Sequence, residues 1–354
     1  MGESVLLLSH GLFASLAPPR IIQTMNAMSD TSKQGSALPK APICVPAWRS
    51  TVLVLVIGSA ACYALPEQLG LLARIFVTAL LVLSLDLVVG VAGLATLGHA
   101  AMFGIGAYAA GNFALHVVPD PLIGLVIGMA SGAALAFLSG LFLLRYEGFT
   151  FLMLTVAVSQ IMLSLAQKAR DWTGGDDGLS GFMNSPLLGR FAFDLEGKVA
   201  AGYSLAVLVV LFYVARRVVD SPFGLAVRGV HENRARMAAL GTPVFRRLLA
   251  MYSLAGMFAG AAGALSAQTN AVVGLDSLSF ALSAEILVML VLGGIGSLNG
   301  ALIGATVFTL LHHTASSINP YHWLFVVGFL LMAVVLVSPT KAIALLRRRM
   351  GGAK

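Results

Sequence analysis

Asp86, His99 and Glu285 are ionisable residues that stand within long runs of apolar residues. An ionisable side chain is costly to hold in lipid, so it marks either a path for a polar solute or a pairing inside the bundle. Asp86 and His99 could pair with each other, or they could be packing groups close enough to the interface to stay hydrated. Glu285 follows only a few residues after its apolar run begins, so it could also face an aqueous vestibule.

Glycine interrupts two of the apolar runs. The segment GGIGSLNG covers residues 293–300, and a second glycine-rich stretch covers residues 88–111. Broken helices survive in a membrane only inside a bundle or beside a water-filled path, although tight helix packing explains these glycines equally well. We therefore predict discontinuous or re-entrant helices at both places. The candidate residues of a translocation pathway are Asp86, His99, Glu285, Gly293, Gly294 and Gly296.

Residues that could carry enzymatic chemistry do not form any known set. The sequence has no nucleophile–base–acid motif, no metal motif and no phosphate-binding loop. Gly104, Gly106 and Ala109 imitate a dinucleotide fingerprint, but they lie in an apolar helix without a preceding strand. Cys44 and Cys62 provide neither a disulfide framework nor a metal cluster. We expect no catalytic residue, no metal, no cofactor and no hydrolysis of ATP by this chain itself.

The composition places these residues in a membrane protein. Of the 354 residues, 58% are hydrophobic and 10% are charged, whereas about 25% of residues in a soluble domain are charged. The formal net charge of +7 does not indicate nucleic-acid binding, because the basic residues flank the apolar runs. The predicted fold is an all-α polytopic helix bundle with about ten transmembrane segments. These are residues 51–65, 70–91, 97–116, 121–144, 149–167, 199–217, 248–270, 281–294, 297–313 and 322–338.

The two ends of the chain differ from this membrane domain, which we place at residues 51–340. Residues 1–50 hold a weak apolar patch and a run rich in Ser, Pro and Lys, so we expect a disordered cytosolic tail. Translation could instead begin at Met25 or Met28, which immediately precede the polar run. Residues 341–354 form a basic cytosolic tail.

The distribution of charge predicts the orientation in the membrane. Arginines crowd the loop 217–247, and basic residues follow the last span, so both regions should be cytosolic. The loop 168–198 balances acidic and basic residues and should lie outside. Ten crossings with both termini in the cytosol satisfy these assignments.

Small residues form a stripe along one predicted span. Gly124, Gly128, Gly132, Ala136 and Gly140 recur every four residues. In lipid, such a stripe lets two helix backbones approach closely. We interpret these glycines as packing residues and not as a ligand site.

The loop segment 221–243 has the pattern of one amphipathic helix. Ser221 and Pro222 are typical of a helix start, and Gly241 followed by Pro243 is typical of a helix end. Val230, Met237 and Leu240 would share one apolar face, and the opposite face would carry Arg228, Glu232, Arg234 and Arg236. Such a helix could lie on lipid or fit a groove on a partner protein, and we favour the partner.

Five segments together carry a resemblance. They are LDLVVGVAGLATLGHAAMFGIGAY (85–108), RYEGFTFLMLTVAVSQI (145–161), TGGDDGLSG (173–181), SPFGLAVRGVHENRARMAALG (221–241) and SAEILVMLVLGGIGSLNGALIGA (283–305). In this order they make residues 70–315 resemble the LivM-type permease subunits of branched-chain amino-acid ABC importers. Departures from the family pattern are Asp86 where Asn is common, Arg236-Met237 in place of smaller residues, and Gly300-Ala301 in place of Gly-Pro.

The resemblance implies a function and a set of partners. The chain would move branched-chain or other hydrophobic amino acids from a periplasmic binding protein to the cytosol, across a bacterial inner membrane. It would pair with a second permease subunit and with two ABC ATPase subunits that bind the ATP. The segment 221–241 would contain the coupling helix that docks on an ATPase. Its coupling residues would be Arg228, Glu232, Arg234, Ala239, Leu240 and Gly241.

Other functions remain open at this point. Relatives in this family carry urea, short amides or aromatic acids, and the exact substrate is not set by any residue rule. An ion-coupled secondary transporter would also explain broken helices and buried carboxylates, but it would not need a docking helix. An intramembrane enzyme would need a catalytic set.

Overall fold

The computed structural model describes residues 47–64, 66–182, 185, 197–318 and 328. The predicted basic tail and, apart from residue 328, the predicted span 322–338 lie outside the described residues. The predicted N-terminal tail lies outside them too, except that its last residues already belong to helix α3 (Ala47–Ala64).

The described part of the chain contains nine long helices, and they correspond to the first nine of the ten predicted spans. They are α3 (Ala47–Ala64), α4 (Leu69–Asp86), α5 (His99–His116), α6 (Pro121–Leu143), α7 (Phe149–Lys168), α9 (Lys198–Val219), α12 (Val244–Asn270), α13 (Phe280–Gly293) and α14 (Leu298–Ile318). Short elements connect them: η1 (Pro66–Gln68), η2 (Leu87–Val91), α8 (Arg170–Thr173), η3 (Gly175–Asp177), β1 (Leu179–Ser180), α10 (Pro222–Glu232), α11 (Arg234–Ala239), β2 (Val272–Val273) and η4 (Leu275–Leu278). Among the described residues, 5 helices are long and apolar enough to cross a membrane, or 6 if one bent pair counts as a span. The all-α membrane bundle is confirmed, and the count of ten crossings stays a prediction.

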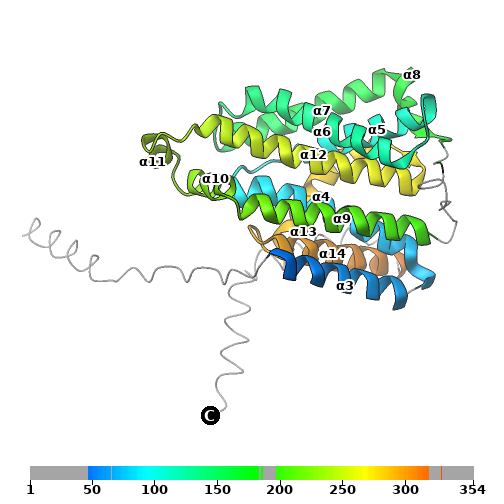
Figure 1. Ribbon diagram of the computed structural model, residues 1–354. Coiled ribbons are helices and arrows are strands. Elements are labelled where there is room, and N and C mark those ends of the chain that lie inside the picture. Colours follow the sequence, from blue (N-terminus) through cyan, green and yellow to red (C-terminus); the bar gives the residue numbers. More distant parts are fainter. Residues whose placement is uncertain (1–46, 65, 183–184, 186–196, 319–327, 329–354) are drawn as a thin grey trace, which may run out of the picture. The chain divides into compact units, whose positions relative to one another are not determined.

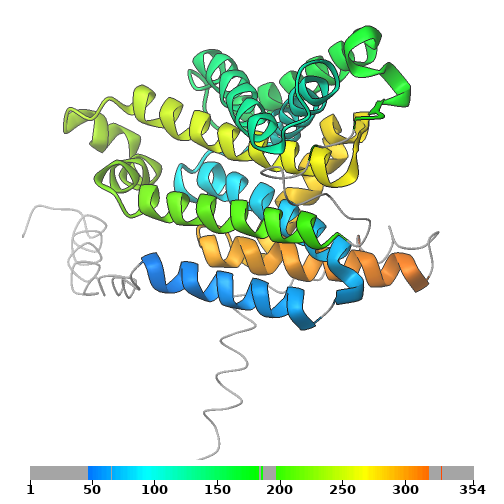
Figure 2. The same cartoon turned by 45° about the vertical axis from the view of Figure 1, so that its right-hand side comes forward.

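Helices α4 and α12 form the centre of the bundle (Figure 1). In the apolar stretch that runs through α4 and η2, 83% of the residues are buried, and in that of α12 the share is 78%. The corresponding shares are only 28% for α6 and 22% for α7. Helix α12 packs on α5 and α6 on one side and on α4 on the other. Figure 2 shows α12 lying between these two groups of helices. The two central helices therefore join the halves of the bundle.

The contact between α6 and α12 is made by small residues. A β-carbon at Gly260 of α12 would collide with the backbone oxygen of Gly128, and one at Gly132 would collide with the backbone oxygen of Gly256. Backbones this close leave no room for a side chain. The predicted packing stripe of α6 is confirmed, and its partner is α12.

Both predicted interruptions are present. Helices α13 and α14 are bent by 116° at a short turn, in which Gly294 and Gly296 have φ of 96° and 83°. L-residues with a side chain rarely adopt this backbone region, so the turn depends on glycine. The other interruption begins with η2, a π-helical turn at the end of α4, and continues as irregular chain up to α5. Such turns occur frequently at functional sites.

The bundle has two ends that the connecting elements distinguish. At one end β1 pairs with β2 in antiparallel register, Leu179 opposite Val273, and we call this the β1 end. At the other end α10 and α11 connect α9 to α12, and we call this the α10 end (Figure 1). The described part of the balanced loop and the arginine-rich loop therefore lie at opposite ends of the bundle.

Candidate functional site

The segment 221–243 is two helices, so the prediction of one continuous helix is wrong. The predicted ends are confirmed: the Ser221 hydroxyl accepts a hydrogen bond from the Gly224 amide at 3.3 Å, and Gly241 has φ of 80°. The break falls at Asn233, whose backbone is extended, with φ −158° and ψ 100°. Its side chain accepts a hydrogen bond from the Arg236 amide at 2.8 Å and thereby starts α11.

The break separates residues that we expected on one apolar face. Val230 is fully buried against the bundle, whereas Leu240 is 73% exposed. Met237, which stands between these two residues in the sequence, is half-buried. The direction of the chain changes at Asn233, so helical spacing does not carry over from α10 to α11. As a result the exposed end of the segment presents Ala239, Leu240 and Gly241 outward.

Side chains on either side of the break at Asn233 contact other parts of the bundle. The Arg234 guanidinium forms an ion pair with Glu147, which lies in the connection between α6 and α7. The ring of His231 lies against Gly93, where a β-carbon would collide with it. Gly93 lies two residues after the end of η2, so the end of α10 touches the interruption between α4 and α5. Glu232 is exposed, and Arg228 is half-buried.

Asp86 joins the two interruptions. Its carboxylate is fully buried, and Oδ1 accepts a hydrogen bond from the Gly296 amide at 2.7 Å. Oδ2 has no hydrogen-bond partner among the described residues. A β-carbon at Gly90 would collide with this carboxylate and with the backbone of Gly296. Arg228 of α10 is near enough to act on Asp86 electrostatically.

His99 and Glu285 do not join this cluster. His99 is fully buried, and its Nε2 lies 2.8 Å from the hydroxyl of Ser84, so the suggested pairing with Asp86 is wrong. Glu285 is half-buried in the first half of α13, where Arg74 acts on it electrostatically. Asp86 and Glu285 therefore belong to different parts of the bundle.

The three candidate glycines all belong to the bend between α13 and α14. A β-carbon at Gly293 would collide with the backbone oxygen of Gly300 in α14, so Gly293 allows the two helices to meet. Gly294 and Gly296 supply the positive φ angles of the turn. The structure brings Gly296 of this bend to Asp86 and leaves His99 and Glu285 elsewhere.

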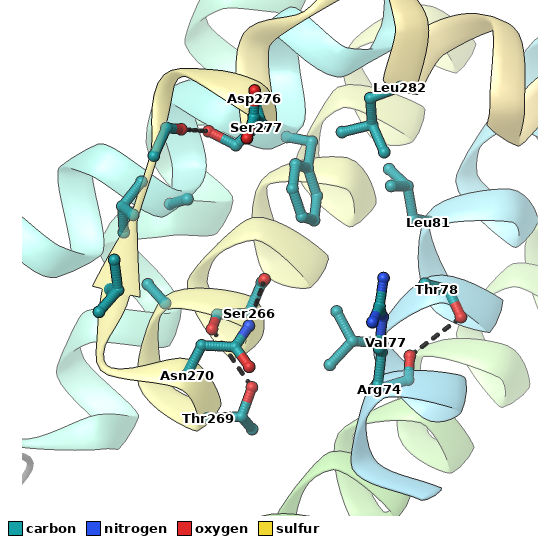
Figure 3. Close-up of a pocket in the computed structure, with 16 residues that line it drawn as sticks. Arg74, Val77, Thr78, Leu81, Ser266, Thr269, Asn270, Asp276, Ser277 and Leu282 are labelled. Carbon is teal, nitrogen blue, oxygen red and sulfur yellow. Dashed lines mark hydrogen bonds between the residues drawn. The ribbon is translucent and has the colours of Figure 1, made fainter. Parts of the chain in front are cut away.

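The bundle also contains a cavity of about 330 Å³ that the sequence patterns did not predict. It lies between α4, α5, α12, η4 and α13, and its charged lining residues are Arg74 and Asp276 (Figure 3). Arg74 gave a signal in the sequence, because it is the single basic residue of the predicted span 70–91. Asp276 gave none, since it stands in a short connection outside the apolar runs.

Comparison with known proteins identifies relatives. Residues 68–335 match the family described as branched-chain amino acid transport system / permease component. The high-affinity branched-chain amino acid transport system permease protein LivM of Salmonella typhimurium is 29% identical over 282 residues, which is 72% of this chain and 64% of that protein. LivM of Escherichia coli is 28% identical over the same length and the same shares of the two chains. The galactose/methyl galactoside import permease protein MglC of Haemophilus influenzae is 24% identical over 238 residues, 63% of this chain and 68% of that protein.

Two facts limit what these similarities show. The chain spans 64% of the length of the LivM proteins. No solved structure matches it. The family match nevertheless runs from η1 past the end of α14 and includes the cluster at Asp86, the segment 221–243 and the cavity at Arg74. The chain therefore belongs to the family of permease components of branched-chain amino acid transport systems.

Proposed function

We propose that this chain is the transmembrane permease subunit of an ATP-driven ABC importer that moves branched-chain or other hydrophobic amino acids into the cytosol. In this proposal the chain is a transport subunit and not an enzyme, and separate ATPase subunits bind and hydrolyse the ATP. Membership of the permease family and the names of the LivM relatives support the transport role and the class of substrate.

The observation that carries the proposal is the segment 221–243. Val227 and Val230 are fully buried and fix α10 to the bundle, whereas Glu232, Leu240 and Gly241 are exposed. A segment held on one side and open on the other suits a groove on a partner protein. Anionic lipid headgroups would repel Glu232, which favours a protein partner over the membrane surface.

The same segment suggests how ATPase closure would reach the membrane part. His231 lies against Gly93, and Arg228 acts on Asp86, which holds the turn at Gly296. A movement of α10 would therefore be felt at both interruptions of the bundle. Packed elements with discrete arrangements transmit small shifts in this way.

The remaining parts of the proposal concern partners and place. The importer would contain a second permease subunit, two ABC ATPase subunits and a periplasmic substrate-binding protein. The chain would lie in the bacterial inner membrane with the α10 end and both termini in the cytosol. The arginines near α10 support this orientation, because cytosolic loops carry an excess of basic residues.

Reconstitution of the complete importer in liposomes tests the proposal. We expect leucine uptake that needs ATP and the binding protein and that persists when ionophores collapse all ion gradients. Liposomes without the ATPase subunits are the control. Uptake that follows an ion gradient and ignores ATP would show a secondary transporter instead.

A further inference from the structure

The cavity at Arg74 combines opposite charges with an apolar wall. Arg74, Val77, Thr78 and Leu81 of α4 form one side of it. Figure 3 shows Ser266, Thr269 and Asn270 of α12 on the opposite side, with Asp276 and Ser277 of η4 at the upper end. The volume of about 330 Å³ falls within the range of roughly 300 to 1,000 Å³ that is typical of small-molecule sites.

The two charges are available to a ligand. Arg74 and Asp276 are both exposed side chains, and no ion pair joins them among the described residues. Arg74 also acts electrostatically on Glu285 and His312. A guanidinium has five N–H donors in a planar fork, so it can face Glu285 and still offer donors to a carboxylate in the cavity.

The uncharged lining fits the side chain of a small hydrophobic amino acid. Val77, Leu81, Phe103 and Leu282 supply an apolar wall. The turn that carries Asp276 is fixed, because the Ser277 hydroxyl donates a hydrogen bond to the Gly274 carbonyl at 2.7 Å. On the α12 side, the Asn270 side-chain amide donates a hydrogen bond to the Ser266 hydroxyl at 3.3 Å. The site therefore has one cationic, one anionic and one apolar part.

We propose that this cavity binds a zwitterionic α-amino acid, with Arg74 facing its carboxylate, Asp276 facing its ammonium group and the apolar wall holding its side chain. The inference rests on the proposed function, since that function delivers amino acids to the chain. Arg74 lies near the start of α4, so the cavity belongs to the β1 end of the bundle. In the proposed orientation, substrate would meet this site before it reaches the turn at Gly296.

A photoreactive leucine carrying a diazirine tests the site in the purified importer. We expect it to label peptides of α4, α5 and α13 that line the cavity, and we expect excess leucine to compete. Leucinamide lacks the carboxylate and isocaproate lacks the ammonium group, so each should compete at least about tenfold more weakly than leucine. Label elsewhere, or label that leucine does not displace, would overturn the inference.

Variants assign the two charges. Arg74→Gln and Asp276→Asn should each lower labelling by about tenfold or more. In Arg74→Gln, leucinamide should compete as well as leucine, and in Asp276→Asn isocaproate should do so. Arg170→Gln and Asp177→Asn make the same changes at exposed positions of the β1 end outside the cavity and should label like the unchanged protein.

Further readings separate folding and transport from binding. Membrane abundance reports whether Arg74→Gln folds, and Arg74→Lys, which keeps the positive charge, tests the carboxylate contact. Labelling should fall less in Arg74→Lys than in Arg74→Gln, and equal loss in both at normal abundance would overturn the assigned carboxylate contact. ATP-driven uptake without labelling in the cavity would overturn this inference alone. Labelling in the cavity without ATP-driven uptake would support the site and contradict the proposed transport function.

Discussion

Asp86 shows how one buried carboxylate can position a distant turn. Its Oδ1 accepts the Gly296 amide from 210 residues away, and the absence of a side chain at Gly90 lets the two segments meet. A hydrogen bond to a charged group is worth roughly 1.5 to 3 kcal/mol. Asp86 is therefore a positioning residue for the bend between α13 and α14, and its part in transport stays a prediction.

Two substitutions at Asp86 separate the hydrogen bond from the charge. Asp86→Asn keeps an oxygen that can accept the Gly296 amide, so the protein should assemble and still transport, with at most a changed rate or selectivity. Asp86→Leu removes the acceptor of this part-buried hydrogen bond to a charged group, which is worth roughly 1.5 to 3 kcal/mol, so stability and transport should both fall. Thermal melting and uptake at equal membrane abundance measure the two effects. Failure of Asp86→Asn to assemble would show that the charge itself is structural.

At the scale of elements, α10 and α11 carry the predicted coupling role. The turn at Gly241 has a positive φ and open space around it, since a β-carbon there would meet nothing within 4 Å. A large side chain would therefore project away from the bundle and hold a docked ATPase apart. Gly181 at the β1 end also has a positive φ and open space. The two glycines form a matched pair.

We predict that Gly241→Trp lowers co-purification of the ATPase subunits by about tenfold or more, equivalent to about 1.4 kcal/mol. Gly181→Trp shares the backbone strain but should leave ATPase association unchanged. Glu232→Ala should act like Gly241→Trp, only more weakly. Normal ATPase association and normal uptake in Gly241→Trp would remove the coupling role from this segment.

The contact of α6 with α12 yields a second prediction about elements. In Gly260→Ala the new methyl group meets the backbone of Gly128, which no side-chain rotation can relieve. Overpacking of this kind costs about 1 to 3 kcal/mol, so the melting temperature should fall. Gly202→Ala on α9 makes the same change where nothing lies within 4 Å and should be neutral or slightly stabilising. Equal melting of both variants would contradict the tight contact.

At the scale of the whole molecule, the two ends of the bundle should face different compartments. Asp176 lies in η3 near the β1 end, and Asn233 lies between α10 and α11. Both side chains are exposed. The surplus of arginine around α10 predicts that Asn233 faces the cytosol.

Cysteine labelling tests this orientation. With Cys44 and Cys62 replaced, Asp176→Cys should react with a membrane-impermeant thiol reagent on intact cells whose outer membrane is permeable. Asn233→Cys should react only after the inner membrane is opened. The reverse pattern would invert the orientation, and equal labelling of both on intact cells would contradict opposite sides.

The sequence alone determined the features that depend on neighbouring residues. Long apolar runs predicted the helices, the segment GGIGSLNG predicted the bend, and the small residues every four positions predicted a close helix contact. Ser221 and Gly241 predicted the ends of the segment 221–243. These signals are local, because hydropathy, caps and positive φ angles are properties of short stretches of chain.

Only the tertiary structure decided which distant residues meet. Lipid is as apolar as the interior of the bundle, so a membrane helix shows no clear pattern for its buried face. The sequence therefore could not pair Asp86 with Gly296, assign Ser84 to His99 or bring Arg74 and Asp276 to one cavity. The break at Asn233 was not predicted for another reason, because the flanking residues suit a continuous helix. The role of Asn233 as a helix cap became evident only from the hydrogen bond that its side chain accepts from the Arg236 amide.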